Sequence, residues 1–131
     1  MIVVDASALV AIGDEEADAD DFLAALRRDE STISGINYVE AGIILIGRRR
    51  LATQQDFDQW VGRLNVAIEP SERLAADALA AYLVFGKGFH SAKLNLANCF
   101  AYALAKALDA PLLYKGNDFA LTDVRPAIQP T

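Results

Sequence analysis

Four acidic or amide side chains stand where short apolar segments meet helical patterns in this sequence. They are Asp5, Glu40, Asn98 and Asp118. Clustered carboxylates raise one another's pKa unless a cation neutralises them, and oxygen ligands select hard divalent ions such as Mg²⁺ or Mn²⁺. A metal held in this way activates water and neutralises charge on a phosphodiester. If folding brings the four side chains together, the chemistry that they favour is metal-assisted hydrolysis of a phosphate ester.

Three of these residues also have a purely structural interpretation. Glu40 is three residues after Asn37, and Asn98 is three residues after Asn95. This spacing is typical of a capping box, in which the later side chain bonds back to the first residue of a helix. Asp118, in Gly-Asn-Asp, is compatible with an ordinary turn. Taken singly, each of the three favours the structural interpretation.

The apolar pattern predicts the elements that must position these residues. Short apolar or β-branched runs predict strands at Met1–Val4, Ser31–Ser34, Val66–Ile68 and Pro111–Tyr114, with Ala127-Ile128 as a short fifth. Helical spacing predicts helices at about 14–28, 37–50, 53–64, 71–85 and 96–108. Strands alternating with helices predict an α/β fold: a mostly parallel sheet of four or five strands with helices on both faces, in a single domain spanning residues 1–131.

Such a sheet binds its ligands beyond the carboxyl ends of the strands, where the following helices begin. Asp5 ends the first predicted strand, and Asp118 follows the fourth. Glu40 and Asn98 fall in the first turns of predicted helices, which share this edge. Asp5 closes a buried strand and has no evident structural partner. The coincidence of four such residues at one edge therefore favours a site over four separate structural roles.

The net charge of −6 argues at first sight against a nucleic-acid partner. The whole excess lies in one run, Asp14, Glu15, Glu16, Asp18, Asp20 and Asp21. This run is expected to be the solvated start of a helix remote from the site; the alternative is a patch that repels phosphate or meets a basic partner. From Lys87 to Lys115 the chain is net basic, and Lys87, His90 and Lys93 are weak candidates for holding an RNA phosphate.

A single cysteine excludes an internal disulfide and a multi-cysteine zinc site, and it suits a reducing compartment. We expect no membrane segment, because no apolar run approaches the roughly 20 residues that span a bilayer. The beginning of the chain lacks the pattern of a signal peptide. The sequence therefore predicts a cytoplasmic location.

Four stretches of the chain resemble, in order, the motifs of PIN-domain proteins, and specifically of VapC-type toxins from bacterial toxin–antitoxin pairs. They are residues 2–11, 34–40, 86–105 and 112–124. The resemblance implies a Mg²⁺- or Mn²⁺-dependent endoribonuclease that hydrolyses RNA phosphodiesters and is inhibited by a cognate VapB-type antitoxin. It also implies a homodimer.

The resemblance implies a role for each site residue. Asp5 is the central metal ligand, and Glu40 holds a second metal ion or orients the attacking water. Asp118 supplies a further ligand, with Asp123 as a weaker candidate. Ser7 adds a hydroxyl group close to Asp5.

One position departs from the family pattern, because Ala97-Asn98 stands where the family has Gly-Asp. Asparagine keeps one oxygen but loses the negative charge, so metal affinity should fall. We therefore expect a chain that folds normally and cleaves RNA poorly, through engineered inactivation or natural degeneration. The main alternative is a catalytically inactive PIN-like binding module that sequesters RNA or the antitoxin. A phosphoacceptor receiver domain is disfavoured, because the segment 66–70 lacks the central aspartate that it requires.

Overall fold

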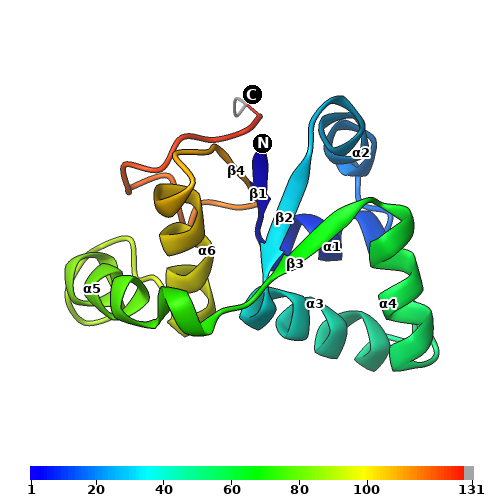
Figure 1. Ribbon diagram of the computed structural model, residues 1–131, viewed down its shortest axis with the longest axis horizontal. Coiled ribbons are helices and arrows are strands. Elements are labelled where there is room, and N and C mark those ends of the chain that lie inside the picture. The colour runs from blue at the N-terminus through cyan, green and yellow to red at the C-terminus, as the bar shows by residue number, and fades with distance from the viewer. Residues whose placement is uncertain (129–131) are drawn as a thin grey trace.

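A computed structural model describes residues 1–128, which form a parallel sheet with helices on either side (Figure 1). The strands are β1 (Ile2–Val4), β2 (Ser31–Ser34), β3 (Val66–Glu69) and β4 (Leu112–Leu113), in the spatial order β3-β2-β1-β4. The predicted α/β class is confirmed, with four strands. Of the four or five strands predicted, four are present among the described residues. Ala127-Ile128, the optional fifth, is not a strand, and the neighbouring Pro126 forms an isolated bridge with Leu112.

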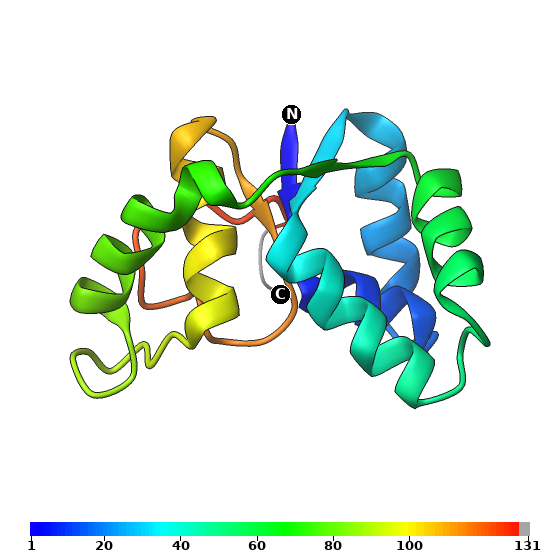
Figure 2. The ribbon, with the colours of Figure 1, turned by 60° about the horizontal axis from the view of Figure 1, so that its bottom comes forward.

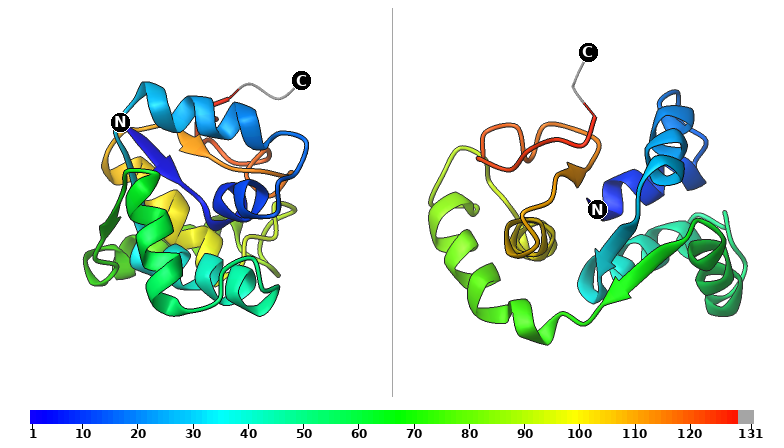
Figure 3. Two further views of the ribbon diagram at one scale, coloured as in Figure 1. Left: turned by 90° about the vertical axis from the view of Figure 1, so that its right-hand side faces the viewer. Right: turned by 45° about the horizontal axis from the view of Figure 1, so that its top comes forward.

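The helices connect parallel strands that a tight hairpin cannot join. They are α1 (Ala6–Gly13), α2 (Ala19–Arg28), α3 (Gly35–Gly47), α4 (Gln54–Arg63), the short 3-10 helix η1 (Glu72–Leu74), α5 (Ala75–Phe85) and α6 (Leu96–Ala107). In Figures 2 and 3, α1 to α4 gather on one side of the sheet and α5 and α6 on the other. Within residues 1–128, no helix combines the length and the apolar character needed to cross a membrane.

Two buried clusters, one on each face of the sheet, hold these layers together. Along β1 the side chains alternate between faces, as in any strand: Val4 joins the cluster beneath α1 to α4, and Val3 joins the cluster beneath α5 and α6. Phe57 anchors the first cluster and Phe119 the second, and each is 1% exposed. The prediction of helices on both faces is therefore confirmed.

The predicted helix at 14–28 is wrong at its beginning. The structure has α1 directly after Asp5, a turn over residues 14–18, and only then α2. Helix α1 is buried along most of its length, so its sequence is apolar almost all round and shows little helical periodicity. Asp5 is its N-cap, a structural role that the sequence did not reveal.

Helix α3 begins two residues earlier than predicted. Its N-cap is Ser34, whose Oγ accepts a hydrogen bond from the Asn37 backbone N–H at 3.1 Å. Asn37 is therefore not the cap, and Glu40 lies in the second turn of the helix rather than the first. The capping-box interpretation of Glu40 is wrong, which leaves its carboxylate free to serve a site.

Candidate active site

A polar pocket of about 340 Å³ lies at the carboxyl edge of the sheet. It brings together the four residues that the sequence singled out, together with Ser7: its lining consists of Asp5, Ser7, Val10, Glu16, Glu40, Ile44, Arg48, Asn95, Asn98, Lys115 and Asp118. These residues come from the ends of β1 and β4 and from helices α1, α3 and α6, elements that lie far apart in the chain. The parallel topology makes them neighbours, because it points every strand end toward one edge.

Asp5 lies at the bottom of this arrangement and is 3% exposed. Its Oδ2 accepts a hydrogen bond from the Ser7 backbone N–H at 3.0 Å. Its Oδ1 is buried and has no hydrogen-bond partner among the described residues. Burial raises the pKa of Asp5 above its ordinary value, hydrogen bonds from Ser7 oppose the rise, and the charge of Asp118 adds to it. A buried carboxylate oxygen without a partner is costly, so the site is built to receive a cation or a proton donor.

Glu40 is the second acid of the pocket. Burial raises the pKa of its carboxyl group, the charge of Asp5 raises it further, and the amide of Asn37 lowers it. Asn37 is fully buried, and its Nδ2 donates to the Ala97 carbonyl oxygen at 2.9 Å. This one amide therefore joins the start of α3 to the start of α6, the two helices that carry Glu40 and Asn98.

Asn98 occupies the third position of α6 and closes a capping box. Its Oδ1 accepts from the Asn95 backbone N–H at 3.0 Å, and Asn95 Oδ1 accepts from the Asn98 backbone N–H at 2.8 Å. The structural interpretation of Asn98 is thus confirmed, and the residue also lines the pocket. The other polar atom of the side chain is Nδ2, which donates hydrogen bonds and cannot bind a metal ion.

The donor set fits a hydrated Mg²⁺ ion better than a metal chelated entirely by protein. Among the described residues, no three His, Cys, Asp or Glu side chains gather closely enough to chelate an ion. Asp5, Glu40 and Asp118 all line the pocket but do not form such a group. Mg²⁺ keeps several of its waters and takes one or two carboxylates directly. Asp5, with its unpaired oxygen, fits a direct ligand, and the other two acids fit ligands that act through water.

Asp123, the weaker candidate, does not line this pocket. Its carboxylate accepts from the Tyr102 hydroxyl at 2.6 Å and from Lys106 Nζ at 3.1 Å. These bonds lower the pKa of Asp123, with the Tyr102 bond the largest cause. In the structure described, Asp123 joins the C-terminal segment to α6 at a distance from Asp5 and its neighbours.

The loop that follows α5 holds the three weak candidates for RNA binding. Lys87, His90 and Lys93 all lie outside the lining of the polar pocket. His90 Nδ1 accepts from the Ala92 backbone N–H at 3.0 Å, and its ring packs edge-on against Phe85 at 5.1 Å between ring centroids. His90 therefore stabilises the loop in this structure.

The acidic run is not remote from the site, contrary to the expectation. Glu16 lines the pocket and accepts from Lys115 Nζ at 2.7 Å, and Asp18 accepts from the same Nζ at 3.2 Å. Lys115 is not among the predicted site residues, although it follows β4 as Asp118 does. The expectation that ligands bind beyond the carboxyl ends of parallel strands would have included it. Nothing in the sequence marks Glu16 as its partner, because the turn at 14–18 was expected to be helix.

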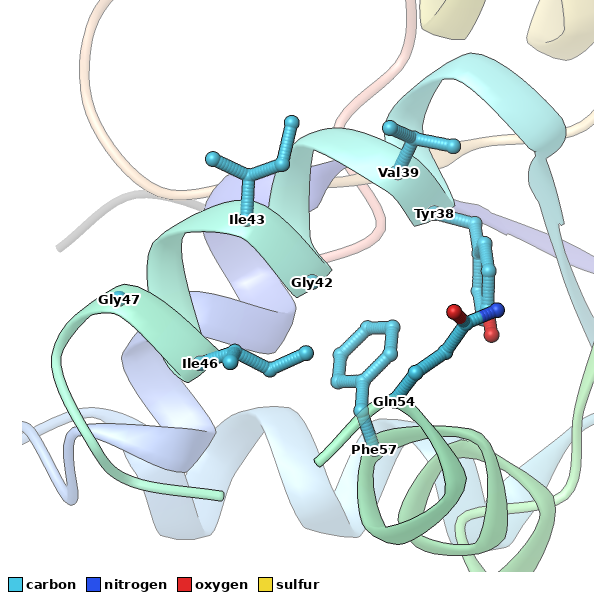
Figure 4. A pocket seen from close by; sticks show the side chains of 8 residues that line it. All are labelled: Tyr38, Val39, Gly42, Ile43, Ile46, Gly47, Gln54 and Phe57. Atoms are coloured by element: carbon cyan, nitrogen blue, oxygen red, sulfur yellow. The ribbon is translucent and has the colours of Figure 1, made fainter. Parts of the chain in front are cut away.

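An apolar groove lies between α3 and α4, on the other flank of α3 (Figure 4). Its lining consists of Tyr38, Val39, Gly42, Ile43, Ile46, Gly47, Gln54 and Phe57, around about 540 Å³. Phe57 and Ile46 point into the space between the helices. A Cβ atom at Gly42 would approach Phe57 Cε2 to 3.0 Å, so glycine allows this close packing. Val39 and Ile43 are 52% and 69% exposed, which leaves an apolar face open to solvent.

Comparison with known proteins gives a consistent family resemblance. The family model of the PIN domain matches residues 2–124. Ribonuclease VapC of Mycolicibacterium smegmatis is 42% identical over 125 residues, which cover 94% of this chain and 97% of that protein. Ribonuclease VapC30 of Mycobacterium tuberculosis is 39% identical over 131 residues, which cover 98% of this chain and all of that protein.

The fold is also that of a known structure. The crystal structure of Mycobacterium tuberculosis VapC20, described as a toxin that cleaves the sarcin–ricin loop, matches with a TM-score of 0.74. The match covers 99% of this chain and 100% of the other, at 17% sequence identity. At this identity the likeness concerns the arrangement of strands and helices.

Proposed function

The chain belongs to the PIN-domain family, among the VapC ribonucleases, and from this premise we propose that it is a metal-dependent endoribonuclease toxin that hydrolyses RNA phosphodiesters. The observation that carries the proposal is the buried, unpaired Oδ1 of Asp5 in one pocket with Glu40 and Asp118. Burying a carboxylate oxygen without a partner beside other acids is costly, and the arrangement is explained if a divalent cation normally binds there.

The residues of the pocket divide the work of hydrolysis between them. Asp5 would hold Mg²⁺ or Mn²⁺, with Asp118 acting through water. When bound, the metal lowers the pKa of a water molecule and neutralises charge on the phosphate. Glu40, whose pKa is raised by burial, would orient the attacking water and accept its proton. The Ser7 hydroxyl, in the first turn of α1, accepts a hydrogen bond from the Lys115 backbone N–H and so holds the segment after β4 beside Asp5.

Asn98 should weaken this reaction. Its oxygen already caps α6, and its remaining polar atom is a donor. An aspartate could cap the helix with one oxygen and present the other to a metal-bound water. We therefore propose a slow ribonuclease whose fold is intact.

The antitoxin is proposed to dock in the apolar groove between α3 and α4. An amphipathic helix can place an apolar stripe in such a groove, here against Val39 and Ile43. Glu40 and Ile44, which directly follow Val39 and Ile43 in the sequence, line the polar pocket. A partner bound in the groove therefore contacts the face of α3 that adjoins the site. A VapB-type antitoxin, a homodimer and a cytoplasmic location remain predictions from the family resemblance.

RNA cleavage by the purified chain tests the proposal. Labelled RNA should be cut slowly in Mg²⁺ or Mn²⁺, and EDTA should stop the reaction. Asp5→Asn should remove the remaining activity, while Asp123→Asn, outside the pocket, should leave it unchanged. Cleavage that persists in Asp5→Asn would assign the activity to a contaminating nuclease and refute the proposal for this chain.

The commitment of the Asn98 oxygen to the helix cap favours a second candidate, a binding module without catalysis. Such a protein would bind RNA or its antitoxin but leave RNA intact at every metal concentration. Titration with Mn²⁺, followed by calorimetry and by RNA cleavage on the same samples, separates the two. Metal binding with cleavage supports the ribonuclease, and RNA binding without cleavage at saturating metal supports the binding module.

A further inference from the structure

Two cations line the same pocket as the carboxylates, and the hydrolytic roles above leave both unused. Lys115 follows β4, and its side chain is 36% exposed. Arg48 caps the carboxyl end of α3, eight residues and about 12 Å along the helix from Glu40. Residues 40, 44 and 48 share one helix face, so Arg48 extends the polar pocket outward along α3.

Carboxylates from the turn between α1 and α2 neutralise both cations. Lys115 Nζ donates to Glu16 Oε1 at 2.7 Å and to Asp18 Oδ1 at 3.2 Å. These bonds raise the pKa of the Lys115 ammonium group, so it stays charged. Arg48 pairs with Asp14 at the other end of the turn. The two Lys115 pairs are 36% exposed on both sides, and ion pairs at such exposure contribute little net stability, so Lys115 can exchange these carboxylates for another anion at small cost. Asp14 is only 11% exposed, but it keeps a second partner, Arg50 Nε at 3.0 Å, if Arg48 leaves it.

The position of Lys115 relative to Asp5 suits an anion that enters the pocket. Its backbone N–H donates to Ser7 Oγ at 2.9 Å, which fixes the residue beside the start of α1. The carboxylates that line the pocket repel phosphate, so a phosphodiester that approaches Asp5 needs a cation at the edge of the pocket. Phosphate oxygens accept short charge-assisted hydrogen bonds from lysine.

We propose that Lys115 binds a backbone phosphate of the RNA beside Asp5, and that Glu16 and Asp18 compete with the RNA for its ammonium group. Arg48 extends the contact along the RNA once a second phosphate group displaces Asp14 from it. The assignment rests on the proposed ribonuclease function and gives its acidic pocket a means of attracting a polyanion. The carboxylates of the turn between α1 and α2 then determine how tightly the protein binds RNA.

The experiment measures binding of a short labelled single-stranded RNA by fluorescence anisotropy in Ca²⁺, at several salt concentrations. Lys115→Met should weaken binding about fivefold and lower the salt dependence by about one phosphate contact. Glu16→Gln should strengthen binding about twofold, because it frees Lys115 and removes a repelling charge. The control pair is Lys106→Met and Asp123→Asn, which breaks a more exposed lysine–carboxylate ion pair outside the pocket. Each control variant should change RNA binding by less than Lys115→Met or Glu16→Gln does.

Opposite changes in RNA affinity in Lys115→Met and Glu16→Gln distinguish substrate binding from a structural role of the ion pair. If the Lys115–Glu16 pair only stabilises the fold, both variants should lower the melting temperature and shift RNA affinity in the same direction, and the assignment is then overturned. Equal binding by Lys115→Met and the unaltered chain overturns it as well, while leaving the proposed function standing. An unaltered chain that binds no RNA overturns the proposed function and the assignment together.

Discussion

The backbone N–H of Lys115 donates a hydrogen bond to Ser7 Oγ at 2.9 Å, across 108 positions of sequence. The bond joins the segment after β4 to the first turn of α1. Asp5, the N-cap of α1, lies two residues before Ser7. The Ser7 hydroxyl group therefore holds Lys115, just after β4, beside Asp5, the most buried carboxylate of the site.

Replacing Ser7 with alanine should loosen this junction. A partly buried N–H would lose its acceptor, at a cost of about 1 kcal/mol in the free energy of unfolding, which corresponds to roughly 3–5 °C in melting temperature. Calorimetry of Ser7→Ala measures this directly. Ser7→Thr keeps the hydroxyl and is the control; an equal loss of stability in Ser7→Thr would show that the bond is not the cause.

Replacing Asp5 with asparagine should stabilise the metal-free chain at neutral pH. Burial raises the pKa of Asp5, so ionising this side chain costs more in the folded state than in the unfolded state. We expect the melting temperature of Asp5→Asn in EDTA to exceed that of the unaltered chain by about 3–6 °C. Adding Mn²⁺ should then stabilise the unaltered chain and leave Asp5→Asn unaffected.

The pH dependence of this difference has a definite sign. A carboxyl group whose pKa is raised on folding stabilises the chain most when pH is below its unfolded pKa, and this contribution is lost as pH rises through the folded pKa. The advantage of Asp5→Asn in EDTA should therefore be largest near neutrality and shrink toward acid pH, where Asp5 itself is protonated. A difference that stays constant with pH would contradict the raised pKa.

Replacing Asn98 with aspartate should increase RNA cleavage. The new carboxylate can keep the cap on Asn95 with one oxygen and serve the metal site with the other, and changes to such ligands alter metal affinity about 10- to 100-fold. Initial rates in Mn²⁺ should rise by at least the lower of these factors. Equal rates, with equal metal affinity by calorimetry, would show that the amide is not the defect.

Replacing Ile43 with arginine should weaken antitoxin binding without unfolding the protein. Ile43 is 69% exposed, so the charge stays solvated in the free chain, but a docked apolar helix would bury it. Binding to a cognate VapB-type antitoxin should fall at least about tenfold, with the melting temperature unchanged. Leu79→Arg on α5 is the matched control, since Leu79 is 62% exposed. If Leu79→Arg weakens binding and Ile43→Arg does not, the antitoxin docks on α5 instead.

The sequence by itself determined the class of fold and the edge at which the site residues meet. Alternating strands and helices require a parallel sheet, and a parallel sheet points all its strand ends one way. Asp5 and Asp118 are fixed to that edge by the strands that precede them. Glu40 and Asn98 reach it because helices begin where strands end, so even an error of two residues in the start of α3 left Glu40 in the pocket.

Only the tertiary structure decided how each residue is used. Helix α1 has no periodic signal because it is buried along most of its length, so the cap at Asp5 was invisible. A side chain can close a capping box only if it lies three residues after the N-cap, so the outcome depends on where the helix starts. Helix α6 starts after Asn95, so Asn98 closes a capping box, whereas α3 starts after Ser34, so Glu40 does not. The pairing of Lys115 with Glu16 depends on a turn that brings distant segments together. Local pattern fixes which side chains share an edge, whereas contacts between distant segments fix their partners and charges.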